Sequence, residues 1–185
     1  EIAMAFTTEP KVAYRAAQLY AGIRTQVRLQ ELDSGLIPQL HDEVLAWLAE
    51  QGTQPSGPPF MRYYVINMED KMDIELGWPI DKELMGNGRI NVSEFPAGRY
   101  ASLVYTGIEN GIPGNAALIE WAEQQGLLWD RWEDPQGDAF AARVEYFLTD
   151  PADEPDMSQW ETEVAIKLAD AEQLELLEKK LEEKV

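Results

Sequence analysis

The sequence predicts an α+β fold in which two similar β-α-β-β units share an antiparallel sheet. One observation is a strand pair that occurs twice, at residues 60–78 and 142–166. Another is that a helix precedes each pair and ends alike, with Trp47-Leu48-Ala49-Glu50-Gln51-Gly52 against Trp121-Ala122-Glu123-Gln124-Gln125-Gly126. Apolar and polar residues alternate in the strands, which is typical of antiparallel sheets. The repeat predicts pseudo-twofold halves with a central ligand cleft, and chance similarity of short segments is the alternative.

The first half is expected to span residues 10–80. Alternation after Lys11 predicts a strand, because Val12, Tyr14 and Ala16 alternate with Ala13 and Arg15. A helix then follows Gly35 and ends at Gly52, with its apolar residues at helical spacing. Residues 53–59 form a proline-rich loop, and strands at 60–68 and 72–78 complete this half.

The second half is expected to span residues 88–170, after a link at 79–88. It has extended segments at 89–95 and 98–105, and then a helix that Asn115 caps and Gly126 ends. Strands at 141–149 and 160–168 flank an acidic loop. The tail, 171–185, is predicted to be a charged helix that docks through Leu174, Leu177 and Leu181, because this stripe is too short for a coiled coil.

Composition limits the class of partner. The chain has 185 residues, 45% of them hydrophobic, which suits a single domain with a sizeable core. Its formal net charge is −19, which argues against binding nucleic acid or anionic membranes. Such a chain attracts cations or basic partners, although a solvated acidic surface explains the charge equally well.

Several kinds of site are excluded or disfavoured by residue usage. The sequence has no cysteine, which excludes disulfides, thiol catalysis and thiolate zinc sites and fits a cytoplasmic location. Its single histidine, His41, is expected to be exposed, and we expect neither a metal nor a cofactor. No apolar run has membrane-spanning length, and Glu1-Ile2-Ala3-Met4 lacks the pattern of a signal peptide.

The strand faces place several glutamates together. In the strand at 141–149, Ala142, Val144, Tyr146 and Leu148 form an apolar face, while Arg143, Glu145, Phe147 and Thr149 form a mixed one. We expect apolar faces to pack under the helices. The mixed faces, which carry Glu75, Glu145 and Glu163 beside Tyr64 and Phe147, then either meet water or line an aromatic cleft. Such a cleft would suit a lipophilic cation, which both charges and rings attract.

Several motifs resemble one known family. They are Phe95-Pro96-Ala97-Gly98-Arg99-Tyr100-Ala101, Val144-Glu145-Tyr146, Thr162-Glu163-Val164-Ala165-Ile166 and Ile74-Glu75-Leu76-Gly77-Trp78-Pro79-Ile80. In this order and spacing they resemble the GyrI-like small-molecule-binding family, which includes effector-binding domains of multidrug-responsive transcription regulators. The resemblance covers residues 10–170 and implies a pseudo-twofold α+β fold with a cleft for cationic, aromatic ligands.

The resemblance also assigns residues. Glu145 matches the family's buried acidic ligand residue, and Glu163 matches the carboxylate on the last strand. Apart from the resemblance, we expect Tyr64, Tyr105 and Phe147 to be ring contacts of the ligand, and Trp132 to pack in the core or to cap the ligand. Where the family often has a histidine followed closely by Gly-Pro, this chain has Val104-Tyr105-Thr106-Gly107-Ile108, so Tyr105 is the candidate replacement. The chain has no room for a helix-turn-helix domain and looks like a stand-alone version.

Three functions follow as hypotheses. The first is a cytoplasmic binding protein for amphipathic aromatic cations, with Glu145 and Glu163 as counter-charges. The second is a hydrolase of reactive cyclopropane-containing natural products, similar to some stand-alone relatives, with a cleft glutamate and Tyr64 or Tyr105 in catalysis. The third is a protein-binding inhibitor. A small-molecule ligand is the expected partner, and the oligomeric state is left open.

Overall fold

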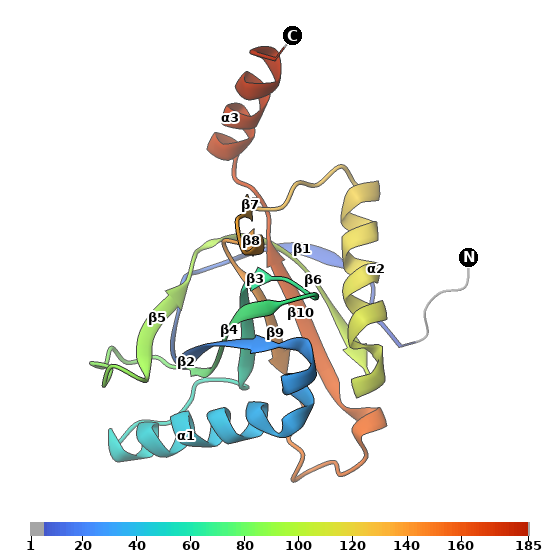
Figure 1. Cartoon of the computed structure of the whole chain (residues 1–185). Coiled ribbons are helices and arrows are strands. Elements are labelled where there is room, and N and C mark those ends of the chain that lie inside the picture. The colour runs from blue at the N-terminus through green and yellow to red at the C-terminus, as the bar shows by residue number, and fades with distance from the viewer. Residues whose placement is uncertain (1–5, 185) are drawn as a thin grey trace.

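One antiparallel sheet forms the body of the computed structural model, which describes residues 6–184 (Figure 1). The mixed helix-and-sheet fold predicted from the sequence is confirmed. The strands are β1 (Lys11–Arg15), β2 (Gln18–Arg28), β3 (Phe60–Ile66), β4 (Lys71–Pro79), β5 (Asn91–Phe95), β6 (Gly98–Thr106), β7 (Arg131–Asp134), β8 (Gly137–Phe140), β9 (Arg143–Phe147) and β10 (Glu161–Lys167). The helices are α1 (Leu36–Glu50), α2 (Gly111–Gln124) and α3 (Ala171–Glu182). Short 3-10 turns lie at Leu29–Ser34, Ile108–Asn110 and Met157–Gln159.

The sheet order is nearly palindromic. Its central path runs β6-β10-β9-β3-β4-β2, so that strands in corresponding positions of the sequence lie at corresponding distances from the β9–β3 junction. Each side has the order strand, helix, strand, strand. The matched helix ends also share a backbone conformation, because Gly52 and Gly126 have φ values of 70° and 69°. Only glycine adopts this left-handed conformation at little cost, which explains why both helices stop there.

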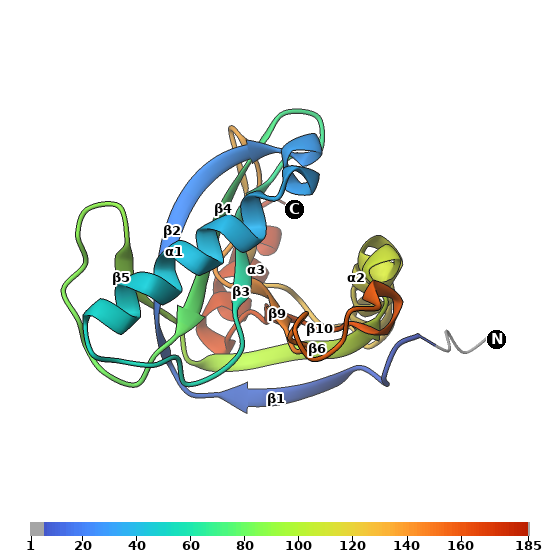
Figure 2. The same ribbon diagram turned by 90° about the horizontal axis from the view of Figure 1, so that it is seen from below.

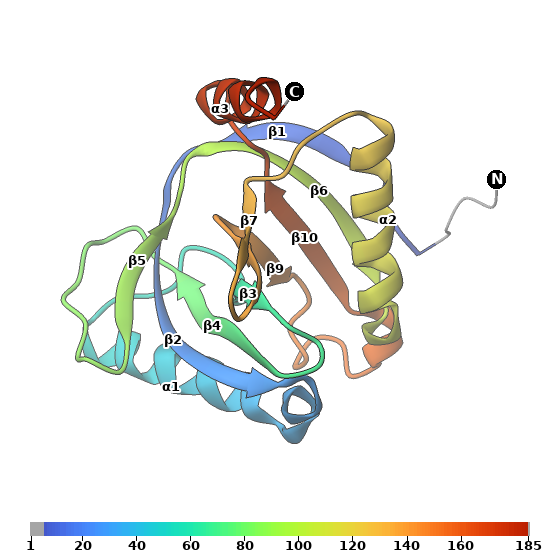
Figure 3. The same cartoon turned by 45° about the horizontal axis from the view of Figure 1, so that its top comes forward.

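The outermost strands cross between the two sides. β1 leads directly into β2 but pairs with β6, and β5 leads into β6 but pairs with β2. Figure 3 shows the consequence: β1 and β2 form one long ribbon that follows both margins and curls the sheet into a half-barrel. The two sides are therefore tied together at both margins as well as at the β3–β9 pair in the centre.

Three hydrophobic clusters fill the molecule. One packs under α1 and includes Leu40, Val44 and Met61, and a second packs under α2 and includes Leu118 and Val164. The third lies on the other face of the sheet, inside the curl, and is rich in aromatic rings: Tyr20, Phe60, Phe95, Tyr100 and Tyr146. The central strands are therefore covered on both faces. In Figure 2, β3, β9 and β10 lie between the two helices.

This double coverage overturns the predicted faces of β9. Val144 belongs to the aromatic cluster inside the curl, together with Ala142 and Tyr146, so this apolar face is turned away from the helices. Phe147, from the mixed face, packs instead against the cluster under α1. The prediction was wrong because an apolar face marks burial and does not say which layer covers it.

Two further elements differ from expectation. The hairpin of β7 and β8 was not predicted, although the turn sequence Asp134-Pro135-Gln136-Gly137 indicates it. The predicted docking of α3 was also wrong, because the helix has no buried residue and stands away from the body (Figure 1). Only its start is attached, where Gln173 donates to the buried Asp130 at 2.7 Å.

Two predictions concern residues that the structure does not describe. The signal-peptide argument fell on residues 1–4, and the predicted tail helix included Val185, all of which lie outside the described residues. Within residues 6–184, no helix is both long and apolar enough to cross a bilayer.

Candidate functional site

Glu145 lies in the middle of the sheet, on β9, where the two sides of the fold meet. It is paired with Val164 on β10 and with Met61 on β3. Directly paired residues in antiparallel strands point to the same face. Because Val164 packs under α2 and Met61 under α1, the Glu145 side chain lies on the helix-bearing face, between the two cores. We call this place the seam.

Three neutral groups donate hydrogen bonds to the Glu145 carboxylate. The Asn115 amide, from α2, donates to Oε1 at 3.1 Å, and the Tyr105 hydroxyl, from β6, donates to Oε2 at a long 3.5 Å. The Tyr63 hydroxyl, from β3, donates as well. Only 7% of Glu145 is exposed. No ion pair formed by residues 6–184 includes Glu145, so neutral groups supply its hydrogen bonds while the Arg143 charge acts on it without direct contact.

The Asn115 side chain is held from two directions. Its Nδ2 also donates to the Gly111 carbonyl at 2.8 Å, and its Oδ1 accepts from Nη2 of Arg143 at 3.0 Å. The Arg143 guanidinium lies over the Phe140 ring, 4.8 Å from its centroid, and its buried Nε has no partner among the described residues. Arg143 thus acts on Glu145 mainly by orienting the amide between them.

Close packing of α2 covers the Tyr105 ring. A Cβ added at Gly114 would lie 2.8 Å from Cδ1 of Tyr105, so only glycine lets the helix approach the ring this closely. Asn115 was expected to cap this helix, but the helix begins at Gly111 and Asn115 lies inside it. From its position inside the helix, the Asn115 side chain reaches Glu145 in the seam.

Burial changes the acid–base properties of the seam. Burial raises the pKa of Glu145, and the hydrogen bond from Asn115, the Arg143 charge and the two tyrosine hydroxyls only partly oppose it. Burial and the nearby Glu145 also raise the pKa of Tyr63 and of Tyr105, so both remain hydrogen-bond donors at neutral pH. A buried carboxylate with a raised pKa gains most from a positive charge brought beside it.

Phe147 and His41 extend the seam towards α1. Phe147 is on the same face of β9 as Glu145, two residues on, and its ring meets the His41 ring edge-on at 5.7 Å. His41 was expected to be exposed, but it is buried and its Nε2 lies 2.8 Å from the Phe60 carbonyl oxygen. Burial lowers the pKa of His41, so the imidazole is neutral at neutral pH.

Glu163 lies on the opposite face of the sheet from Glu145. It is paired with Tyr146, which belongs to the cluster inside the curl. Its Oε1 is 2.8 Å from Nη2 of Arg15, on β1. The expectation that Glu145 and Glu163 share one mixed face is therefore wrong, because neighbouring strands place them one register position apart.

Tyr64 also lies away from the seam, beside Glu75. Its hydroxyl donates to Oε1 of Glu75 at 2.7 Å, and the buried Tyr20 hydroxyl donates to the same oxygen at 2.5 Å. Two guanidinium groups lie close to the Tyr64 ring, from Arg24 at 3.7 Å and from Arg62 at 4.4 Å to its centroid. This network ties together β2, β3 and β4 inside the curl.

The six predicted ligand residues thus separate into groups. Glu145, Tyr105 and Phe147 lie on the helix-bearing face, whereas Glu163 and Tyr64 lie on the opposite face. Trp132 is on β7, opposite Ala139, and is 51% exposed. Sequence reasoning missed Tyr63 and Asn115 as partners of Glu145. Tyr63 could have been found from its position in an alternating strand. Asn115 could have been noticed only as a polar residue in an apolar helix.

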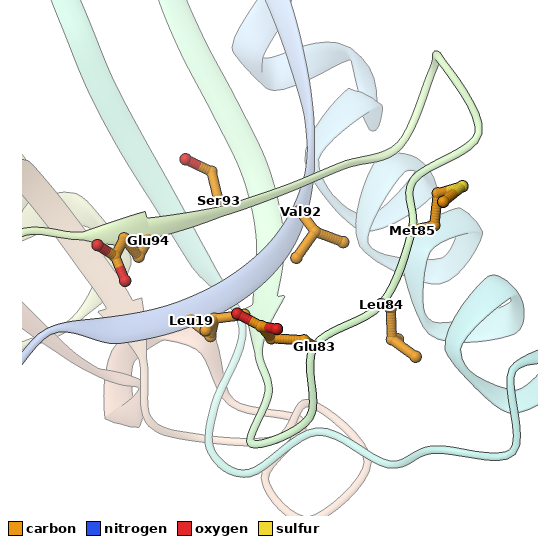
Figure 4. Close-up of a pocket in the computed structure, with 7 residues that line it drawn as sticks. All are labelled: Leu19, Glu83, Leu84, Met85, Val92, Ser93 and Glu94. Carbon is orange, nitrogen blue, oxygen red and sulfur yellow. The ribbon is translucent and has the colours of Figure 1, made fainter.

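Two hollows in the surface lie outside the seam. The larger, of about 580 Å³, lies between β2, β5 and residues 83–85, where Leu19, Leu84 and Val92 are apolar and Glu83 and Glu94 are acidic (Figure 4). The smaller, of about 250 Å³, is lined in part by Tyr146 and Glu163. Glu145 lines neither, since Tyr105 and α2 cover it. Within residues 6–184, no cluster of three or more histidine or acidic side chains is arranged to hold a metal ion.

Comparison with known protein families shows to which family the chain belongs. The family described as the GyrI-like small molecule binding domain matches residues 8–169. The chain belongs to the GyrI-like family. The resemblance predicted from the sequence motifs is thereby confirmed, and the GyrI-like domain accounts for the whole sheet and both covering helices. Small-molecule binding is the general property that this family supports.

Solved structures share the GyrI-like fold at low sequence identity. The C-terminal domain of EcmrR is 15% identical, with a TM-score of 0.67, and the match covers 91% of this chain and 100% of that domain. In an EcmrR–DNA complex the TM-score is 0.70 at 16% identity, and the match covers 91% of this chain and 59% of the EcmrR chain. This chain therefore spans about three-fifths of that regulator.

Two other similar structures have informative names. SAV2435, solved with bound tetraphenylphosphonium, has a TM-score of 0.58 at 11% identity, and the match covers 88% of this chain and 94% of that one. A hydrolase from Listeria innocua has a TM-score of 0.60 at 12% identity, covering 90% and 94%. At these identities the likeness shows the fold alone. The curated proteins gave no match to the sequence.

Proposed function

We propose that this GyrI-like domain binds amphipathic aromatic cations at the seam, with Glu145 as the counter-charge. The main support is that the buried Glu145 carboxylate accepts hydrogen bonds only from neutral groups, those of Asn115, Tyr105 and Tyr63. Leaving a charge buried without an opposite charge is costly, so a cation that replaces one of these donors stabilises the site. The absence of cysteine fits a reducing cytoplasm, which we propose as its location.

Aromatic rings near Glu145 support the choice of ligand. Tyr63, Tyr105 and Phe147 all lie on the helix-bearing face close to the carboxylate. Each ring face attracts a cation by about 0.5–2 kcal/mol, depending on how dry the site is. A structural relative, SAV2435, was solved with tetraphenylphosphonium, a cation of this chemical class. Asn115 and Tyr63 are each partly exposed whereas Tyr105 is buried, so one of these two side chains is the group that an entering ligand displaces.

The test is a titration with rhodamine 6G, followed by fluorescence anisotropy. Glu145→Gln keeps the size of the side chain and removes its charge, and we expect it to weaken binding at least tenfold, about 1.4 kcal/mol. Glu163→Gln is the matched control, because Glu163 lies on the opposite face and its loss should leave the affinity unchanged. Equal affinity of wild type and Glu145→Gln would overturn the role of Glu145.

A hydrolase is the second candidate, favoured by the contact of the Tyr105 hydroxyl with a carboxylate of raised pKa. A protonated Glu145 or the phenol can donate a proton to one carbon of a strained cyclopropane while water adds its hydroxyl to another, so that one ring bond breaks and the remaining proton of the water returns to the donor. A similar fold occurs in the hydrolase from Listeria innocua. The check is mass spectrometry of cyclopropane-bearing electrophiles incubated with the protein. A mass gain of one water that is lost in Tyr105→Phe supports catalysis, and unchanged compounds leave only binding.

A further inference from the structure

The smaller hollow lies inside the curl of the sheet, on the face opposite the seam. Its walls come from distant parts of the chain: Gln18 at the start of β2, the segment 56–58, Pro79 at the end of β4, the end of β9, and Glu163 of β10. Pro58, Pro79 and Leu148 give it apolar walls, and the Tyr146 ring adds an aromatic one. Its volume is about 250 Å³, which is below the 300–1,000 Å³ or so typical of drug-sized ligands.

Three residues that line the hollow each have a side-chain oxygen that no hydrogen bond or ion pair of the described residues occupies. Arg15 occupies Oε1 of Glu163, and no described residue binds Oε2. Gln18 is held by its Nε2, which donates to the Leu19 carbonyl at 2.9 Å and to the Ile80 carbonyl at 3.1 Å, so its Oε1 remains an acceptor. The Tyr146 hydroxyl has no hydrogen-bond partner among residues 6–184.

We propose that this hollow is a second binding site, specific for a small primary ammonium ion with a short apolar tail. A primary ammonium carries three N–H donors, and the hollow offers three oxygen acceptors, from Glu163, Gln18 and Tyr146. The carboxylate supplies the opposite charge, and the prolines and Leu148 contact the alkyl tail. A quaternary ammonium has no N–H donor and cannot use these acceptors.

Arg15 competes with the ligand for the Glu163 carboxylate. It lies 2.8 Å from Glu163, and the two side chains are 30% and 22% exposed. Ion pairs this accessible contribute only about 0–1 kcal/mol, so a ligand can share or replace Arg15 on the carboxylate. The net charge of −19 also raises the local concentration of small cations. Removing Arg15 should therefore strengthen amine binding.

The site is independent of the function proposed for the seam. Glu163 is paired with Tyr146, and Glu145 with Val164, so the two carboxylates occupy opposite faces of adjacent strands. The two sites also differ in the ligand that they select. The seam takes a large aromatic cation among rings, whereas the hollow takes a small amine with N–H donors. Failure of either proposal leaves the other standing.

The test is a titration with n-butylammonium, followed by backbone amide NMR shifts in the full chain. We expect saturable binding with a Kd on the order of 1 mM, because so few atoms make contact. Glu163→Gln should weaken it at least fivefold, Arg15→Gln should tighten it, and Glu145→Gln should leave it unchanged. Equal binding by wild type and Glu163→Gln, or equal binding of tetramethylammonium, would overturn the proposal.

Two further measurements locate the amine and its source. A nuclear Overhauser effect between the butyl chain and the Tyr146 ring is expected, and saturable binding with contacts elsewhere would place the amine at another site and refute this one. Nα-acetyl-lysine amide carries the same ammonium group on a bulkier body. Weaker binding of this compound supports a free small amine, whereas tighter binding would contradict it and favour a protein lysine.

Discussion

At the scale of the residue, Glu145 combines two properties that are seldom found together. It is buried at the centre of the sheet, and it lacks an ion-pair partner among residues 6–184. Its donors are neutral, and the nearest guanidinium, Arg143, reaches it through Asn115. The ionised form therefore makes folding less favourable, and this has a direct consequence for the pH dependence of stability.

Glu145→Gln is expected to stabilise the protein at neutral pH. Because the folded state raises the pKa of Glu145, the folded protein holds this proton more tightly than the unfolded chain does. The free energy of unfolding is therefore lost as pH rises from the unfolded pKa through the folded one, by up to about 1.4 kcal/mol per pH unit. Urea denaturation should show equal stability of the two proteins near pH 4 and an advantage of Glu145→Gln that grows as pH rises until the folded pKa is passed. A constant difference across this range would contradict the raised pKa.

Gly114→Ala should disturb the cover of the seam. The added methyl would lie 2.8–3.0 Å from three carbons of Tyr105, which belong to the ring and its stem and cannot swing away. Overpacking of this kind costs about 1–3 kcal/mol, and the higher helix propensity of alanine offsets at most about 1 kcal/mol of that cost. Gly111→Ala is the control, because its Cβ would make an ordinary 3.4 Å contact with the Tyr105 hydroxyl. Thermal melting should show a lower Tm for Gly114→Ala alone.

The sequence singled out a glutamate that proves to be buried, but it misplaced the surroundings of that residue. The Val144-Glu145-Tyr146 motif identified Glu145, and alternation correctly separated it from Val144 and Tyr146. Alternation could not say which face carries the helices, because the curl of the sheet buries the opposite face with rings such as Phe60 and Phe95. Asn115 was beyond prediction because its role depends on how closely α2 approaches the sheet.

At the scale of the element, predictions from periodicity succeeded where elements are long. The helix before Gly52 and the strands that carry Glu75 and Glu163 lie close to where they were expected. The hairpin of β7 and β8 was missed because each strand has only four residues, too few for an alternation pattern. The leucines of α3 were misread because an apolar stripe shows that a helix is amphipathic and does not show that a partner covers it.

A buried ion pair attaches the β10 end and the start of α3 to the body. Lys167 Nζ lies 2.9 Å from Asp130 Oδ2, and both side chains are about nine-tenths buried. Asp130→Ala leaves Lys167 buried with only the Leu168 carbonyl as a partner and without an opposite charge, and it should cost about 3–5 kcal/mol. Asp138→Ala, which breaks the exposed pair with Arg131, should cost at most about 1 kcal/mol. If urea denaturation shows equal losses of unfolding free energy for the two variants, the buried pair contributes no more to stability than the exposed one.

At the scale of the whole molecule, strand exchange makes the two sides mutually dependent. β1 belongs to the first side in sequence but completes the margin of the second, and β5 does the reverse. The central β3–β9 pair joins the two cores, and Glu145 lies on that junction. A site at the seam therefore requires both sides, and neither side has a complete sheet of its own.

A chain cut in the link between the sides should still assemble. Met85, in this link, is 90% exposed, so separate fragments 1–85 and 86–185 lose one loop and keep every strand pair. We expect the fragments, when co-expressed, to elute together as a 1:1 complex that still binds rhodamine 6G. Each fragment alone should be unfolded by circular dichroism, because its outer strand has lost the strand that it pairs with. A first fragment that folds and remains monomeric by itself would show that the crossed margins are dispensable, and that the symmetry of the sheet reflects two autonomous units.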